Sequence, residues 1–229
     1  MLRSLAFCTL FLVLGNSAWA GIPIDETVVC PVGGEKFTVT RTASCTTFGR
    51  TMSFRPYTSC EFITRLPVCP SNGLPMYQEF TADQVTELTT FVEAPSYATL
   101  KDLSPWQRAY GLSVHLGQSG TETAFWLLMN AMWYEADVFF ESDVALNQLL
   151  QEAEFELERT PEENRPFLNA ILAYALTHAG RIDEANEKLE SARKAPDTPD
   201  YLQKYISAVE VCQSDAEAEV CQPNAGFKP

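Results

Sequence analysis

The sequence predicts an α+β protein in which a small, disulfide-stapled β head precedes an α-helical array. Residues 21–80 are rich in Thr, Pro, Gly, Ser and Cys and contain short alternating runs typical of strands. Residues 81–211 show helical spacing of apolar residues together with helix-capping signals. Six cysteines remain after an N-terminal leader, and an even number in an exported chain favours a disulfide framework.

The first twenty residues have the features of a cleaved signal peptide. Arg3 supplies a basic start, the apolar run Leu5–Leu14 is too short to span a bilayer, and Ser17–Ala20 ends in an A-x-A-like site. We therefore expect cleavage before Gly21, export to the periplasm of a Gram-negative bacterium, and no membrane insertion.

The mature chain is strongly acidic. The formal charge of −14 becomes −15 when Arg3 is removed with the leader, because 15 Lys and Arg then face 30 Asp and Glu. Such a surface repels nucleic acid, and it suits a basic protein partner or solubility alone. We therefore expect no nucleic-acid partner.

Four short runs in residues 21–80 predict strands, and the glycines between them predict turns. The predicted strands are Thr27–Val29, Lys36–Arg41, Met52–Arg55 and Ile63–Leu66. A β unit of this size needs cross-links to be stable.

From residue 81 onwards, capping residues and prolines mark the starts of helices. Thr81–Gln84 and Thr160–Glu163 fit the capping-box pattern, and Ser104-Pro105 puts a proline at a first helical position. A first helix is expected to start near residue 81, and later ones to span about 105–118, 121–139, 143–159, 160–178, 181–194 and 198–211. Residues 212–229 form a tail.

Two segments look like halves of zinc knuckles. In Cys30–Gly34 and Cys69–Gly73, the form C-P-x-C-G has lost its second cysteine to Gly33 and Asn72. Six thiols allow many pairings. If the ribbon shape is retained, the two knuckle cysteines are already near disulfide distance. We therefore predict Cys30–Cys69, then Cys45–Cys60 between neighbouring strands, and Cys212–Cys221 in the tail.

The alternative is a metal site in which Cys30, Cys45, Cys60 and Cys69 stay reduced and converge on one ion. That site needs unusual ligand spacing and competes with oxidation in an exported chain. We expect disulfides, with no metal and no other cofactor.

The order CPVGGEKF, then CPSNG, then helices resembles an uncharacterised bacterial family with a CPxCG…CPxCG zinc-ribbon head and tetratricopeptide-like helices. The segments Phe48–Arg50, Arg55–Tyr57 and Leu66–Gly73 resemble a narrower exported branch that lacks the second knuckle cysteines. The resemblance covers the head well and the helices loosely. It implies a zinc-ribbon-like head and no particular activity.

Residues 168–196 resemble one tetratricopeptide unit, with Gly180 at the turn between its two helices. Small residues at the facing positions let the helices approach closely, and leucines fill the space between them. These positions are Leu172, Ala173, Leu176, Ala185, Leu189 and Ala192. Arrays of such units usually bind another polypeptide.

A candidate binding face lies on the helix predicted at 121–139. Trp126, Asn130, Tyr134 and Asp137 share one side of it, and aromatic side chains beside an amide are frequent in binding surfaces. Because this helix is apolar nearly all round, burial on both sides competes with that interpretation.

No residue pattern nominates an enzyme. Nucleophile motifs, phosphate-cradling loops and H-E-x-x-H are absent. We interpret Glu152, Glu154, Glu156 and Glu158 as a solvated helix region, and His115 and His178 as structural histidines. We therefore expect an exported, non-enzymatic protein that binds a protein or peptide, with a metal-binding module as the alternative.

Overall fold

The computed structural model describes residues 22–60, 65–194 and 198–227. The signal peptide expected at residues 1–20 lies outside this part of the chain. Within it, the protein is α+β: antiparallel strands form the N-terminal part and helices the C-terminal part, as the sequence predicts.

The first hairpin pairs β1 (Pro23–Val29) with β2 (Lys36–Thr42) in antiparallel register. The predicted strands Thr27–Val29 and Lys36–Arg41 both belong to it. Val39 in β2 is buried against the rest of the protein, whereas β1 is mostly exposed.

A second sheet joins the C-terminal tail to the N-terminal half of the chain. Its strand order is β4-β3-β5, with β3 (Thr47–Thr51), β4 (Pro56–Thr58) and β5 (Gly226–Phe227) all antiparallel. The C-terminal tail is therefore part of a sheet that begins in the N-terminal half.

The strand predicted at Met52–Arg55 is wrong. These residues form the turn between β3 and β4, which is closed by hydrogen bonds from the Phe54 N–H to the Thr51 carbonyl and from the Thr51 N–H to the Arg55 carbonyl. The N–H groups of Met52 and Ser53 donate to the carbonyls of Ala225 and Pro223 in the tail. The first two residues of the strand predicted at Ile63–Leu66 lie outside the described residues, and its last two form a bend.

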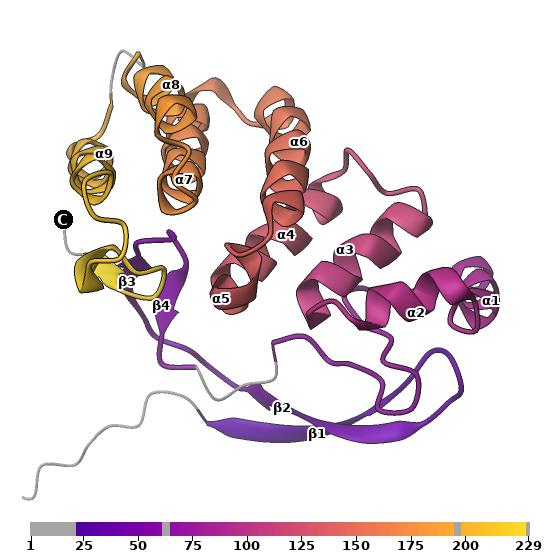
Figure 1. Ribbon diagram of the computed structural model, residues 1–229. Coiled ribbons are helices and arrows are strands. Elements are labelled where there is room, and N and C mark those ends of the chain that lie inside the picture. Colours follow the sequence, from indigo (N-terminus) through magenta and orange to yellow (C-terminus); the bar gives the residue numbers. More distant parts are fainter. Residues whose placement is uncertain (1–21, 61–64, 195–197, 228–229) are drawn as a thin grey trace, which may run out of the picture.

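The helical part starts with α1 (Ala82–Phe91), α2 (Pro95–Lys101) and α3 (Pro105–His115). It continues with α4 (Glu122–Tyr134), α5 (Ala136–Phe139), α6 (Asp143–Arg159), a 3-10 turn η1 (Glu162–Asn164), α7 (Arg165–His178), α8 (Ile182–Arg193), α9 (Asp200–Cys212) and the 3-10 turn η2 (Glu219–Cys221). In Figure 1 these helices follow one another around an arc, and β3 and β4 lie on its inner side.

The helix starts follow the sequence signals in part. Thr81 and Gln84 form the predicted capping box, and Pro105 is at the start of α3. The box predicted at Thr160–Glu163 is wrong, because the Thr160 hydroxyl donates back to the carbonyl of Glu156 at 2.7 Å and closes α6. A 3-10 turn then precedes α7.

The single helix predicted at 121–139 is broken at Glu135, where α4 ends and α5 begins. The Glu135 carboxylate accepts hydrogen bonds from the Ser104 hydroxyl at 2.5 Å and from the Trp106 N–H at 2.9 Å. Trp106 is in the first turn of α3, whose leading N–H groups have no partner within the helix. A side chain distant in sequence thus caps α3 at the point where α4 ends.

Two hydrophobic clusters each contain residues from both sides of residue 80. The larger one unites α3 to α9 and includes Met52 and Phe227. The smaller one packs Cys30 and Cys69 against Tyr97 and its neighbours in α1 to α3. Six positions expected between two close helices are all buried at the α7–α8 hairpin: Leu172, Ala173, Leu176, Ala185, Leu189 and Ala192.

The cysteines form the three pairs that the sequence predicts: Cys30–Cys69, Cys45–Cys60 and Cys212–Cys221. The two half-knuckle segments have the same backbone pattern. Each cysteine N–H donates to the carbonyl five residues on, Glu35 or Leu74, and each accepts at its own carbonyl from the glycine four residues on. Gly34 and Gly73 both have positive φ, at 69° and 75°, which glycine adopts without strain.

Asn72 stands where a full knuckle would have its second cysteine, and its amide now joins the two turns. Its Nδ2 donates to the carbonyl of Val32 at 2.9 Å and lies 3.8 Å from Cys30 Sγ, while its Oδ1 accepts from the N–H of Leu74 at 2.9 Å. Asn72 therefore supports the disulfide that joins the two turns.

Candidate protein-binding surface

The turn between β3 and β4, residues 51–55, is buried against the helices; we call it the buried turn. Thr51 and Ser53 are 0% exposed and Arg55 is 6% exposed, which is unusual for polar residues in a turn. It lies on the inner side of the helical arc (Figure 1).

Hydrogen bonds attach the buried turn to two helices. The indole N–H of Trp133 in α4 donates to the carbonyl of Ser53 at 2.8 Å, and the Tyr205 hydroxyl in α9 donates to the carbonyl of Met52 at 2.7 Å. Buried carbonyls need such partners because water cannot reach them. Burial also raises the pKa of Tyr205 well above its ordinary value, so the phenol stays protonated and able to donate.

Phe54 is the aromatic anchor of the buried turn. Its ring contacts Phe167, Tyr201 and Tyr205, with centroids 6.1, 6.2 and 5.0 Å away. Its φ of 65° is the one positive value at a non-glycine residue among the described positions. Such a conformation is strained by roughly 1–3 kcal/mol and persists only where surrounding contacts impose it.

The predicted binding face on α4 does not form one open surface. Tyr134 lies beneath two guanidinium groups, those of Arg55 and Arg65, at 5.2 and 5.0 Å from its ring centroid. Asn130 donates to the carbonyl of Trp126 within its own helix at 2.6 Å. Trp126 itself is 40% exposed.

Asp137, the fourth residue of that face, is exposed on α5, beyond the helix break at Glu135. The binding role of the four residues stays a prediction. Trp133 of α4, which the sequence prediction did not include, donates a hydrogen bond to the buried turn. It follows Asn130 by three residues, so the helical period places it next to the predicted face, and this spacing could have identified it.

A pair of exposed aromatic rings lies on the β3–β4 hairpin. Phe48 is 60% exposed and Tyr57 is 48% exposed, and their ring centroids are 5.9 Å apart. The register shifts between Thr47 and Gly49, a β-bulge at which Gly49 has a φ of 138°. The bulge leaves the Phe48 ring beside Tyr57 on the surface.

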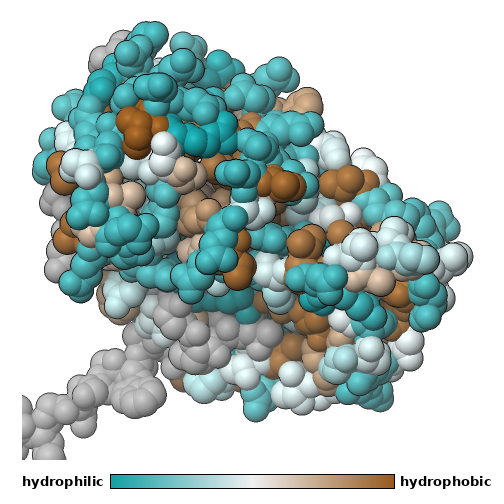
Figure 2. All heavy atoms as spheres, in the orientation of Figure 1, coloured by the Kyte–Doolittle hydropathy of each residue, from teal (hydrophilic) through white to brown (hydrophobic). Residues whose placement is uncertain are grey.

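Charge is distributed unevenly along the chain. Residues 21–80 contain five Lys and Arg and five Asp and Glu, whereas residues 81–229 contain 10 and 25. The excess negative charge therefore belongs to the helical part. In Figure 2 much of the visible helical surface is hydrophilic, and its hydrophobic residues form small, separate patches.

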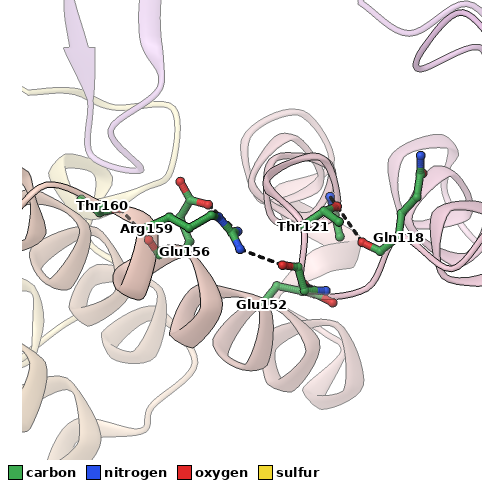
Figure 3. A network of polar contacts seen from close by, with 8 residues as sticks. Gln118, Thr121, Glu152, Glu156, Arg159 and Thr160 are labelled. Atoms are coloured by element: carbon green, nitrogen blue, oxygen red, sulfur yellow. Dashed lines mark hydrogen bonds and ion pairs between the residues drawn. The ribbon is translucent and has the colours of Figure 1, made fainter.

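One glutamate of the predicted solvated region is not solvated, which corrects that interpretation. Glu152 is 1% exposed, and its carboxylate accepts from the Gly120 N–H at 2.7 Å and the Tyr110 hydroxyl at 3.2 Å. Arg159 donates to the Gly120 carbonyl at 2.7 Å and to Glu156. Figure 3 shows this network holding the loop before α4 against α6, which is a structural arrangement.

Titratable groups in the helices are perturbed mainly by burial. Burial, followed by the charge of Glu152 and its hydrogen bond, raises the pKa of Tyr110 to about 12. Burial raises the pKa of Glu135 as well, although its hydrogen bonds from Ser104 and Trp106 act in the opposite direction. Both groups have hydrogen-bond partners: Glu135 accepts from the Ser104 hydroxyl, and Tyr110 donates to Glu152.

All four cysteines of the metal-site alternative are joined in disulfides, and a disulfide offers no thiolate to an ion. Among the described residues, no three His, Cys, Asp or Glu side chains are grouped so that they could hold a metal. Helices capable of crossing a membrane are likewise missing from residues 22–60, 65–194 and 198–227.

These features define the class: an α+β protein with three disulfides, whose helical arc encloses its own β-turn. Three disulfides are typical of proteins from an oxidising compartment outside the cytoplasm. Comparison with known family models, with curated proteins and with solved structures gave no match to this chain.

Proposed function

We propose that this is an exported, non-enzymatic protein that binds a polypeptide partner in the periplasm. In this proposal the half-knuckle turns form a degenerate zinc-ribbon-like head, and α7–α8 is a tetratricopeptide-like unit. The signal-peptide features at residues 1–20 and the three disulfides support export.

The observation that carries the proposal is the exposed pair Phe48 and Tyr57. Large aromatic side chains that protrude side by side supply much of the binding energy at protein interfaces, because they bury a large area with little loss of side-chain freedom. Their hairpin is cross-linked by Cys45–Cys60 at its base, so the rings are held in place before a partner arrives.

The inner side of the helical arc, where arrays of this kind usually hold a peptide, contains the buried turn. The partner therefore contacts the outer surface of the hairpin. The acidic helical part favours a basic partner, since charge of opposite sign speeds encounter and discriminates against acidic proteins.

The proposal is tested by replacing both rings. The mature protein is immobilised and incubated with periplasmic extract, and captured proteins are identified by mass spectrometry. Affinity for the purified candidate is then measured by calorimetry. Phe48→Ala with Tyr57→Ala should weaken binding at least about tenfold, the loss expected from two interface anchors.

The matched control is Val144→Ala with Val211→Ala, which truncates two side chains of similar exposure, 67% and 65%, on α6 and α9. It should leave affinity unchanged. Equal binding by the ring variant and the wild type, or equal losses in both variants, would refute the role of the aromatic pair.

A further inference from the structure

The three disulfides differ in how a reductant can reach them. Cys30, Cys69, Cys212 and Cys221 are at most 3% exposed, so both sulfurs of those two pairs are enclosed. In the third pair Cys60 is buried, but Cys45 is an exposed residue. Thiol–disulfide exchange starts with attack of a thiolate on an accessible sulfur, so access decides which bond reacts first.

The three pairs also differ in whether they belong to a hydrophobic cluster. Cys30–Cys69 belongs to the smaller hydrophobic cluster and Cys212–Cys221 to the larger one. Neither Cys45 nor Cys60 belongs to either cluster. A reductant can therefore reach Cys45–Cys60 without either core opening, whereas reaching the other pairs requires part of a core to open.

The accessible disulfide closes the base of the hairpin that carries the buried turn. Cys45 precedes β3 and Cys60 follows β4, so the cross-link encloses both strands and residues 51–55. Beside it, Ser59 and Thr46 exchange two hydrogen bonds of 3.0 Å. The strands themselves are short and interrupted by the bulge at Gly49, so the ladder is weak without the disulfide.

The tip of the hairpin is held in a strained state. Phe54 keeps its φ of 65° only while the helices and the tail surround it. Freed from the cross-link, the hairpin can leave the helices and the backbone of Phe54 can relax. The disulfide at the base of the β3–β4 hairpin and the buried turn at its tip are thus joined by two short strands.

From these observations we propose that Cys45–Cys60 is a thiol–disulfide exchange site, opened selectively by a dithiol, and that its opening releases the buried turn from the helices. A thiolate of the dithiol attacks Cys45 Sγ, the S–S bond breaks, and Cys60 leaves as a thiolate that takes up a proton. The second thiol of the dithiol then attacks the mixed disulfide, which frees Cys45 as a thiol. Two electrons pass to the protein, and the dithiol becomes a disulfide.

The first test follows the order of reduction in the folded wild-type protein. Mature protein is treated with dithiothreitol without denaturant, quenched in acid, alkylated after removal of reductant, and mapped by peptide mass spectrometry. Cys45 and Cys60 should become labelled at least about tenfold faster than the other four cysteines. Simultaneous labelling of all three pairs, or earlier labelling of another pair, would overturn the proposal.

The second test follows the buried turn by hydrogen exchange once only Cys45–Cys60 is reduced. Peptides that cover residues 51–55 should lose protection while those from α7 and α8 keep it. Unchanged protection of residues 51–55 would refute the coupling between base and tip. Neither measurement requires a binding partner, so failure of the partner proposal and failure of this one are distinguishable.

A pair of double variants separates the site from general disulfide loss. Cys45→Ser with Cys60→Ser should show the exposed turn without reductant while α7 and α8 stay protected. Cys212→Ser with Cys221→Ser removes a cross-link from the larger cluster and should lower protection in α9 as well. If the first variant loses protection throughout the helical part, the disulfide stabilises the whole protein and does not control the buried turn alone.

Discussion

The hydroxyl of Tyr205 in α9 donates a hydrogen bond of 2.7 Å to the carbonyl oxygen of Met52, in the turn between β3 and β4. The last helix of the array therefore holds a segment from the N-terminal half. Because both atoms are buried, the bond is a sensitive probe of how the strands and helices stabilise each other.

Tyr205→Phe should destabilise the protein by roughly 1–3 kcal/mol, because it leaves the Met52 carbonyl buried without its phenol partner. Tyr201→Phe is the matched control, since Tyr201 contacts Phe54 through its ring and keeps that contact when the hydroxyl is removed. Denaturant unfolding measures both. If both variants lose the same free energy of unfolding, the hydrogen bond to Met52 does not contribute measurably to stability.

Replacing Phe54 separates ring packing from backbone strain. Phe54→Ala should destabilise the protein by about 3–5 kcal/mol, because the ring contacts with Phe167, Tyr201 and Tyr205 are lost. Phe54→Gly should be about 0.5–1 kcal/mol more stable than the alanine variant, because glycine adopts a φ of 65° without steric strain. The same ranking must appear in thermal unfolding. An alanine variant as stable as the glycine one would contradict strain at this position.

Asn72→Ala should loosen the two half-knuckle turns. Its amide bonds to Val32 and Leu74 are both lost, which should lower the free energy of unfolding by about 1–3 kcal/mol. The control is Ser71→Ala, one residue earlier, where the backbone N–H still donates to Glu35. Denaturant titration of both variants decides the matter, and a loss confined to the serine variant would reverse the interpretation.

His178 should make stability depend on pH. Burial lowers its pKa below the ordinary 6.5, although the charge of Glu217 acts in the opposite direction. Below pH 6.5 the unfolded chain takes up a proton that the folded protein does not, so stability falls as the pH falls.

His178→Phe keeps an aromatic ring stacked on Phe140 and removes the titration. The difference in unfolding free energy between wild type and variant should shift in favour of the variant as the pH decreases through this range. A difference that stays constant with pH would show that His178 does not carry the effect.

Intact mass tests the disulfide framework. Mature protein under denaturing conditions should gain six hydrogens on reduction, two for each of the three disulfides. Metal analysis of the native protein should find no stoichiometric zinc. Free Cys30 and Cys69 together with bound metal would instead establish the metal-binding alternative.

The sequence by itself determined the features that depend on local chemistry. The α+β class, the capping box at Thr81, the start of α3 at Pro105 and the first hairpin all follow from neighbouring residues. The Cys30–Cys69 pair was predictable because two similar turns, each with its glycine, indicate a shared geometry. The other two pairs join cysteines close in sequence, between neighbouring strands and within the tail.

Only the tertiary structure decided the features that join distant segments. Glu135 lies where α4 ends and its carboxylate caps α3. Glu152 is buried because Gly120 and Tyr110 donate to it. Met52–Arg55 is a buried turn because the helices and the tail supply its partners. Periodicity and capping rules describe contacts within a few residues. A hydrogen bond between residues 52 and 205 satisfies a buried carbonyl that no local rule can see.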